Sequence, residues 1–213
     1  WEKRLNRIDP RLRPEYFTEL KVDGFAISLE YENGRLVTAS TRGDGFVGED
    51  VTENVKTVES VPLILSDLSI LRNVPKEIAA IFREFPRVKD AMRRRTSPIE
   101  VRGEIYMTKQ AFLAVNREQA KRGLPAYANP RNIAAGSIRQ LDPSVAASRK
   151  LDFIAYDLMT DLGQETHEES HHIAKAFGFR TVEHVRRGKS LEEVRDFINA
   201  MGEKREKLEY LID

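Results

Sequence analysis

Apolar and polar residues alternate along two neighbouring stretches in the first quarter of the chain. Every second residue from Phe25 to Tyr31 is apolar, a spacing that predicts a strand with one buried face. Asn33 and Gly34 come next, and this dipeptide between two alternating runs predicts a tight turn into a return strand over residues 35–42. The pattern therefore predicts a β-hairpin.

Later stretches predict strands that are interleaved with helices. Residues 99–107 alternate like the hairpin, and Thr108 is placed to cap a helix that runs to about Lys121. Residues 151–159 are apolar on nearly every side, as is typical of a buried central strand. Further helices are expected near residues 49–55, 75–85 and 167–177 and after Ser190. This order favours an α+β fold of antiparallel sheets flanked by helices.

We expect residues 1–213 to form one domain. Within it, residues 61–98 are irregular and predict an insertion or connector, with a helix that Pro75 can open in its first turn. This segment is expected to lie at the surface and to hold no catalytic residue.

Composition narrows the classes of function. Lys and Arg number 35 against 34 Asp and Glu, so affinity for DNA must come from local patches. The chain has no cysteine, which excludes disulfides, thiolate nucleophiles and a Cys-ligated zinc site within it. No apolar run approaches the ~20 residues that a membrane helix needs. We therefore expect a cytoplasmic protein that does not enter a membrane.

The most informative short motif is Glu-Leu-Lys-Val-Asp-Gly at residues 19–24. It places Lys21 at a strand end before a tight Asp-Gly turn, where its side chain can be held rigidly. A lysine amine is protonated at neutral pH, so a nucleophilic role requires a cationic neighbour, a metal or desolvation. Taken alone, the motif is a weak signal, and a solvated lysine in a turn is the favoured interpretation.

Further motifs follow at separate places along the chain. They are Thr-Arg-Gly-Asp-Gly at 41–45, Gly-Glu-Asp-Val-Thr-Glu-Asn-Val at 48–55, Val-Arg-Gly-Glu at 101–104 and Ala-Asn-Pro-Arg-Asn-Ile-Ala-Ala-Gly-Ser-Ile-Arg-Gln-Leu-Asp at 128–142. With these motifs the chain resembles the covalent nucleotidyltransferases, and most of all the NAD-dependent DNA ligases of the bacterial type. The block at 128–142 is the most diagnostic, because the ATP-dependent relatives lack it. The resemblance covers about the whole chain and implies a nucleotidyltransferase (ATP-grasp-like) fold.

The resemblance also implies a role for individual residues. Lys21 would attack the α-phosphorus of NAD, expel nicotinamide mononucleotide and hold AMP through a phosphoramidate bond. Arg42 would lie near the ribose and phosphate, and Glu104 would accept a hydrogen bond from a ribose hydroxyl. The other implied site residues are Glu19, which would read the adenine amino group, its neighbour Leu20, Tyr156, which would stack on the base, and Arg131 and Arg139, near the nucleotide or the phosphates of DNA.

Each of these residues has a plainer reading when it is taken alone. The three arginines could be ordinary surface or ion-pair residues, and Tyr156 could be a core aromatic on a buried strand. Glu104 alternates with apolar neighbours, so it could simply mark the solvent face of its strand. The order of the motifs, and no single residue, favours the functional reading.

For the intact enzyme, the resemblance implies transfer of AMP from NAD to Lys21, then to the 5′-phosphate of nicked double-stranded DNA, and finally sealing of the nick in replication and repair. Mg²⁺ would assist each transfer. No protein partner is expected. The alternatives are an ATP- or GTP-dependent RNA ligase or capping-type nucleotidyltransferase, and a non-catalytic DNA-binding fragment.

The resemblance further implies segments that this sequence does not contain. Relatives carry an earlier segment that binds the nicotinamide half of NAD, and they continue past an Ile-Asp-Gly stretch into motifs with two more lysines. This sequence ends at Leu211-Ile212-Asp213. We therefore predict that the chain by itself does not seal nicks and adenylates itself feebly or not at all.

A second signature, His-Glu-Glu-Ser-His at residues 167–171, fits the helix of zinc metallopeptidases. That chemistry needs a third ligand and an apolar helix, whereas the flanks at Gln164, Glu165 and His172 are polar. A first helical turn rich in glutamate, which favours the helix dipole, is the plainer reading. We therefore expect no protein ligand for a metal.

Overall fold

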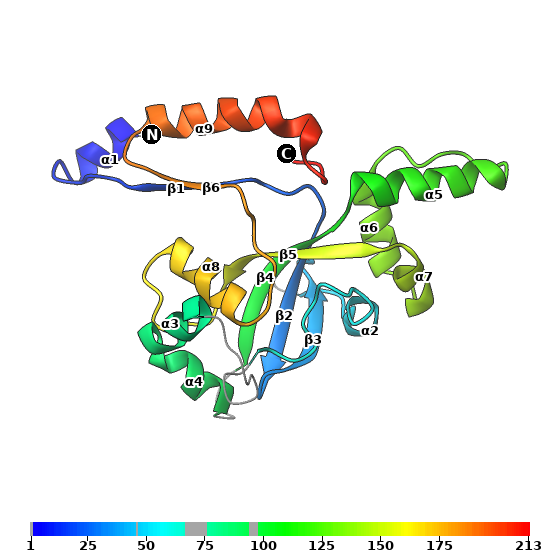
Figure 1. Ribbon diagram of the computed structural model, residues 1–213, viewed down its shortest axis with the longest axis horizontal. Coiled ribbons are helices and arrows are strands. Elements are labelled where there is room, and N and C mark those ends of the chain that lie inside the picture. The colour runs from blue at the N-terminus through cyan, green and yellow to red at the C-terminus, as the bar shows by residue number, and fades with distance from the viewer. Residues whose placement is uncertain (1, 46, 67–75, 94–97) are drawn as a thin grey trace. The chain divides into compact units, whose positions relative to one another are not determined.

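The computed structural model describes residues 2–45, 47–66, 76–93 and 98–213. The chain forms two compact units, and Figure 1 shows the elements of each. Residues 1–20 and 183–208 make the smaller unit, and residues 21–182 and 209–213 make the larger one. Among the described residues, no helix is both long and apolar enough to cross a membrane.

The smaller unit is a two-stranded ribbon with a helix packed on it. Strand β1 (Tyr16–Glu19) pairs antiparallel with β6 (Val185–Gly188), and helix α9 (Leu191–Lys204) packs against both strands. The hydroxyl of Ser190 caps α9 by accepting from the backbone N–H of Glu193. The unit also holds α1 (Glu2–Ile8) and the 3₁₀ turn η1 (Arg205–Lys207).

The larger unit is built on a four-stranded antiparallel sheet in the order β3-β2-β4-β5. Its strands are β2 (Phe25–Glu32), β3 (Arg35–Thr41), β4 (Ile99–Met107) and β5 (Leu151–Leu158). The predicted hairpin is confirmed: Asn33 and Gly34 turn β2 into β3 with φ of 50° and 72°. Antiparallel sheets combined with helices also confirm the predicted α+β class.

Helices cover the apolar face of this sheet, where the alternation of the sequence puts Ile27, Leu29, Val101 and Phe153 into the core. The helices of the unit are α2 (Thr52–Val55), α3 (Lys76–Glu84), α4 (Pro86–Arg93), α5 (Lys109–Lys121), α6 (Pro130–Ile138), α7 (Pro143–Ser148) and α8 (His167–Ala176). Among them, α8 packs against β5, α6 against β4 and β2, and α2 against β3. The predicted Thr108 cap is confirmed, because its side chain accepts from the N–H of Ala111.

Two details differ from the sequence prediction. The apolar strand β5 is not central but ends the sheet order, so that expectation was wrong. Its outer side is covered by the chain after α8, where Ala155 donates its N–H to the carbonyl of Arg180 at 2.8 Å. The described part of 61–98 also contributes Phe82, Phe85 and Val88 to the main core, so it is more than a surface excursion. Pro75 lies outside the described residues.

Candidate active site

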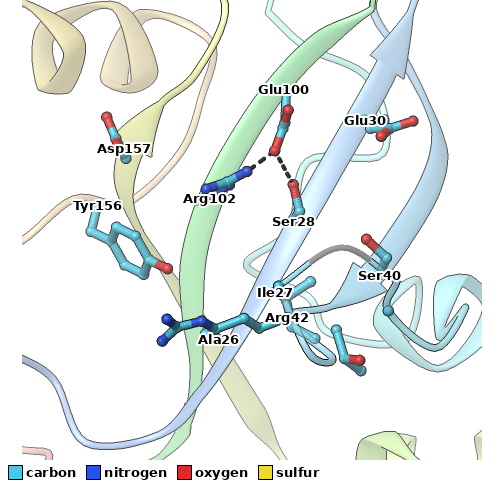
Figure 2. Close-up of a pocket in the computed structure, with 13 residues that line it drawn as sticks. Ala26, Ile27, Ser28, Glu30, Ser40, Arg42, Glu100, Arg102, Tyr156 and Asp157 are labelled. Carbon is cyan, nitrogen blue, oxygen red and sulfur yellow. Dashed lines mark hydrogen bonds and ion pairs between the residues drawn. The ribbon is translucent and has the colours of Figure 1, made fainter.

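The second face of the four-stranded sheet is polar and carries a cavity of about 450 Å³. The strand register places Ala26, Ser28 and Glu30 of β2 beside Glu104, Arg102 and Glu100 of β4. Figure 2 draws the lining residues, which are Ala26, Ile27, Ser28, Glu30, Ser40, Thr41, Arg42, Gly45, Gly48, Glu100, Arg102, Tyr156 and Asp157. A volume in this range suits a small organic ligand.

Tyr156 and Asp157 both line this cavity because β5 contains a bulge. Arg102 pairs with Asp157 and the next residue, Gly103, pairs with Ala155, so Tyr156 is an extra residue in the ladder. Alternation from Ile154, which pairs with Glu104, places the half-buried ring of Tyr156 on the polar face, and the bulge adds Asp157 to the same face (Figure 2). Burial, followed by the nearby charge of Glu104, raises the pKa of the Tyr156 hydroxyl. The ring is therefore a neutral aromatic surface at one wall of the cavity.

Arg42 enters the cavity from the glycine-rich loop that follows β3. The loop folds back on the strand, because Thr41 donates its N–H to the carbonyl of Glu49 at 3.0 Å and its hydroxyl accepts from the N–H of Glu49 at 3.0 Å. A Cβ at Gly48 would lie 1.9 Å from the carbonyl oxygen of Thr41, so this return requires glycine. Figure 2 shows the guanidinium of Arg42 directed toward the ring of Tyr156.

A polar network also lines the cavity, and the sequence patterns did not predict it. Glu100 accepts from the hydroxyl of Ser28 at 2.7 Å and from Nε of Arg102 at 2.9 Å (Figure 2). The signal was present, because strand alternation puts Arg102 two residues from Glu104 and hence on the same face. Arg102 adds a second guanidinium to the cavity, so the site presents two cations and one aromatic ring to a ligand.

Lys21 lies just before β2, beside the last residues of the chain. Its Nζ donates to Oδ2 of Asp213 at 2.6 Å, and the N–H of Asp213 donates to the carbonyl of Lys21 at 3.0 Å. Val22 and Ile212 form a bridge between the two segments. The two side chains are 68% and 62% exposed, so the amine is accessible to a ligand from solvent. Asp213 is a further residue of the site that the sequence analysis left without a role.

Glu104 interacts electrostatically both with Lys21 and with a residue of the cavity. Burial raises the pKa of its carboxyl from 4.5 to about 7, while the charges of Lys21 and Arg131 and the N–H of Gly24 oppose that rise. Glu104 also acts on Tyr156 through its charge. A Cβ at Gly24 would lie 2.3 Å from the carbonyl oxygen of Ile105 and 2.8 Å from Cγ of Glu104, so the Asp-Gly turn requires glycine there.

The two arginines of the diagnostic block both form ion pairs in the larger unit. Nη1 of Arg131, in the first turn of α6, lies 3.2 Å from Oδ1 of Asp23. Nε of Arg139, at the end of α6, lies 3.1 Å from a carboxylate oxygen of Glu49, and its guanidinium stacks 4.9 Å from the centre of the Phe25 ring. Both arginine side chains are 54% exposed, so their charges remain available to an anionic ligand.

The structure thus gathers the predicted residues into two neighbouring groups. Lys21, Glu104 and Arg131 interact around the start of β2, and Arg42 and Tyr156 line the cavity. Glu19 lies in β1 and Leu20 directly follows it, so both belong to the smaller unit, and their contact with adenine stays a prediction. Chemically, the larger unit offers a primary amine, a half-buried carboxyl group, several guanidinium groups and an aromatic ring.

Comparison with known proteins agrees with this combination of groups. The family model of the NAD-dependent DNA ligase adenylation domain matches residues 1–213. The whole chain aligns with proteins named DNA ligase from Natranaerobius thermophilus at 40% identity, Thermotoga neapolitana at 39% and Coprothermobacter proteolyticus at 40%. It spans 28%, 27% and 29% of the length of these three relatives, respectively.

Proposed function

Because the chain belongs to the family of NAD-dependent DNA ligase adenylation domains, we propose that Lys21 takes AMP from NAD and holds it as a covalent lysyl-AMP. The observation that carries the proposal is the position of Glu104, which interacts electrostatically both with Lys21 and with the cavity residue Tyr156. A nucleotide in the cavity would therefore have its ribose and phosphates directed toward the amine. The larger unit would then have the nucleotidyltransferase fold.

In the proposed complex, the adenine ring stacks on Tyr156, whose half-buried ring already lines the cavity. Glu104 accepts a hydrogen bond from a ribose hydroxyl, which requires its carboxyl group to be ionised. Arg42 and Arg102, whose guanidinium groups line the cavity, neutralise phosphate oxygens. Glu19 and Leu20 are further residues that we propose to contact the adenine.

The transfer itself is a displacement at phosphorus. Nζ of Lys21 forms a bond to the α-phosphorus, the bond from that phosphorus to the bridging oxygen breaks, and nicotinamide mononucleotide leaves with that oxygen. An ammonium group has no lone pair, so a proton must first leave Nζ. The carboxylate of Asp213, 2.6 Å away, is placed to accept it. We therefore propose Asp213 as the group that holds this proton.

Mg²⁺, when bound, would supply positive charge at the phosphates. Ions of this kind in phosphoryl-transfer sites are held largely through the phosphates and water, so we name no protein ligand. Arg131 and Arg139 are the residues of the chain that we propose to contact the phosphate backbone of nicked double-stranded DNA. In the complete enzyme, AMP would pass from Lys21 to the 5′-phosphate at the nick before the strands are joined in the cytoplasm.

Mass spectrometry of the complete protein that carries this chain tests the proposal. After incubation with NAD and Mg²⁺, we expect a mass increase of one AMP on the peptide that contains Lys21. Lys21→Arg, which keeps the positive charge, should remain unlabelled. Lys109→Arg, a change in the first turn of α5, should label normally. Labelling from ATP but not from NAD would contradict the NAD assignment and favour an RNA ligase or capping-type enzyme.

The non-catalytic alternative gives a different result. A DNA-binding fragment would remain unlabelled by NAD and would bind nicked duplex equally well with and without Lys21→Arg. Binding and labelling are therefore measured on the same samples.

A further inference from the structure

Helix α8 carries two histidines whose rings approach each other outside the proposed nucleotide site. Nε2 of His167 lies 3.2 Å from Nε2 of His171, and the ring centres are 4.8 Å apart. The residues are four positions apart and therefore share one face of the helix. The pair belongs to the His-Glu-Glu-Ser-His signature, which the proposed ligase chemistry does not use.

The distance between the two nitrogens fits a bound metal ion. Histidine nitrogens lie about 2.0–2.1 Å from zinc in a tetrahedral site, which places two such nitrogens roughly 3.3 Å apart. The observed 3.2 Å matches this spacing without any movement of the side chains. Imidazole nitrogen is a preferred ligand for Zn²⁺, Ni²⁺ and Cu²⁺, and a poor one for Mg²⁺.

The surroundings of His167 also favour metal binding. Its Nδ1 faces Oδ1 of Asp157 at 3.9 Å, on the side of the ring away from His171. The charge of a carboxylate on this side favours a proton on Nδ1, and this is the neutral tautomer in which Nε2 can bind a metal. Oδ1 of Asp157 is itself held, because it accepts from the N–H of Leu158 at 2.9 Å.

Helix α8, which carries both histidines, is stabilised by its N-terminal cap and by its packing. Thr166 and Glu169 form a capping box at its start, and Ile173, Ala174 and Ala176 bury its apolar face. The side chain of His167 is 37% exposed, whereas His171 is only 4% exposed. The pair is therefore accessible from the side of His167.

From this geometry we propose that Nε2 of His167 and Nε2 of His171 bind one divalent transition-metal ion, with Zn²⁺ as the best fit. Asp157 orients His167 without contacting the ion. The proposal assigns a binding site and no hydrolytic activity, and neither histidine takes part in the proposed lysyl-AMP chemistry.

Calorimetric titration of the 213-residue chain with Zn²⁺ tests the site, because this chain has no cysteine to bind zinc elsewhere. We expect one high-affinity ion per chain. His167→Gln and His171→Gln should each weaken binding by about tenfold or more, and Asp157→Asn by about tenfold. His172→Gln changes an exposed histidine of the same helix and should leave the affinity unchanged.

The alternative is a plain hydrogen bond between the two imidazole rings. In that case the double variant His167→Gln/His171→Gln would bind Zn²⁺ as tightly as the unchanged chain, and this result would overturn the proposal. His171 is buried, so circular dichroism of each variant verifies folding. Because the side chain of His167 is more exposed, His167→Gln still tests the site if His171→Gln unfolds.

Discussion

The amine of Lys21 lies 2.6 Å from the carboxylate of Asp213, a residue 192 positions later in the chain. The backbone supports the pair on both sides, because Asp213 donates its N–H to Lys21 and Asp23 donates its N–H to Leu211. Their side chains are mostly exposed, so the ion pair itself contributes little to stability. Its significance is therefore chemical, since it places a proton acceptor beside the proposed nucleophile.

Asp213→Asn should slow AMP transfer to Lys21 in the complete protein by roughly 10²-fold, as expected for loss of a positioned proton acceptor. Asparagine can still bind the amine but does not take its proton at neutral pH. The affinity for NAD should change little. Single-turnover labelling and equilibrium binding separate the two effects, and a variant that labels at the normal rate would remove Asp213 from the mechanism.

Glu104 should make the stability of the chain depend on pH. Because its pKa rises from 4.5 to about 7 on folding, the folded chain keeps a proton that the unfolded chain releases between these values. The free energy of unfolding therefore decreases as the pH rises through this window and levels off above it. In Glu104→Gln this contribution is lost, so its melting temperature should fall less between pH 4.5 and 7. Identical pH profiles for both proteins would argue against the raised pKa.

Tyr156→Ala should weaken binding of AMP to the complete protein by about 5- to 150-fold, because stacking of a base on an aromatic ring contributes roughly 1–3 kcal/mol. Tyr156→Phe keeps the ring and should bind within about threefold of the unchanged protein. Tyr127→Ala removes a tyrosine that packs against Arg149 away from the cavity, and it serves as the control. Calorimetry measures all four affinities, and equal values for Tyr156→Ala and Tyr127→Ala would contradict stacking.

Gly103→Ala should destabilise the chain by about 1–3 kcal/mol, because overpacking forces neighbouring groups to move. A Cβ at this position would lie 2.2 Å from Cζ of Phe153 and 2.3 Å from the carbonyl oxygen of Ile154. Gly136→Ala is the matched control, since a Cβ there meets no atom within 4 Å and alanine favours the helix α6. Denaturant unfolding followed by circular dichroism compares the two, and an equally stable Gly103→Ala would mean that the sheet relaxes around the methyl group.

Arg139→Ala should weaken binding of nicked DNA by the complete protein and lower the slope of log affinity against log salt by about 1, as loss of one phosphate contact predicts. Folding should be little affected, because the Arg139–Glu49 pair is more than half exposed. Arg83→Ala, at an exposed arginine of α3 whose Nε binds the carbonyl of Ala79, is the control. An unchanged salt slope in Arg139→Ala would exclude the phosphate contact.

The sequence by itself determined the four strands of the larger unit's sheet, its helices after Thr108 and near residues 167–177, and the family of the chain. Hairpin, helix caps and strand alternation depend on neighbouring residues, so Asn33-Gly34 and Thr108 could be interpreted locally. The motifs around Lys21 and Glu104 were recognisable for the same reason, since each is a short continuous stretch.

Only the tertiary structure decided which side chains meet. The β5 bulge that brings Asp157 to the polar face beside Tyr156 has no local signature, because it depends on how β5 pairs with β4. The edge position of β5 and the pairing of Lys21 with Asp213 likewise depend on segments that are distant in sequence. Periodicity shows which face of a strand is buried, whereas the strand order and long-range contacts decide what lies against that face.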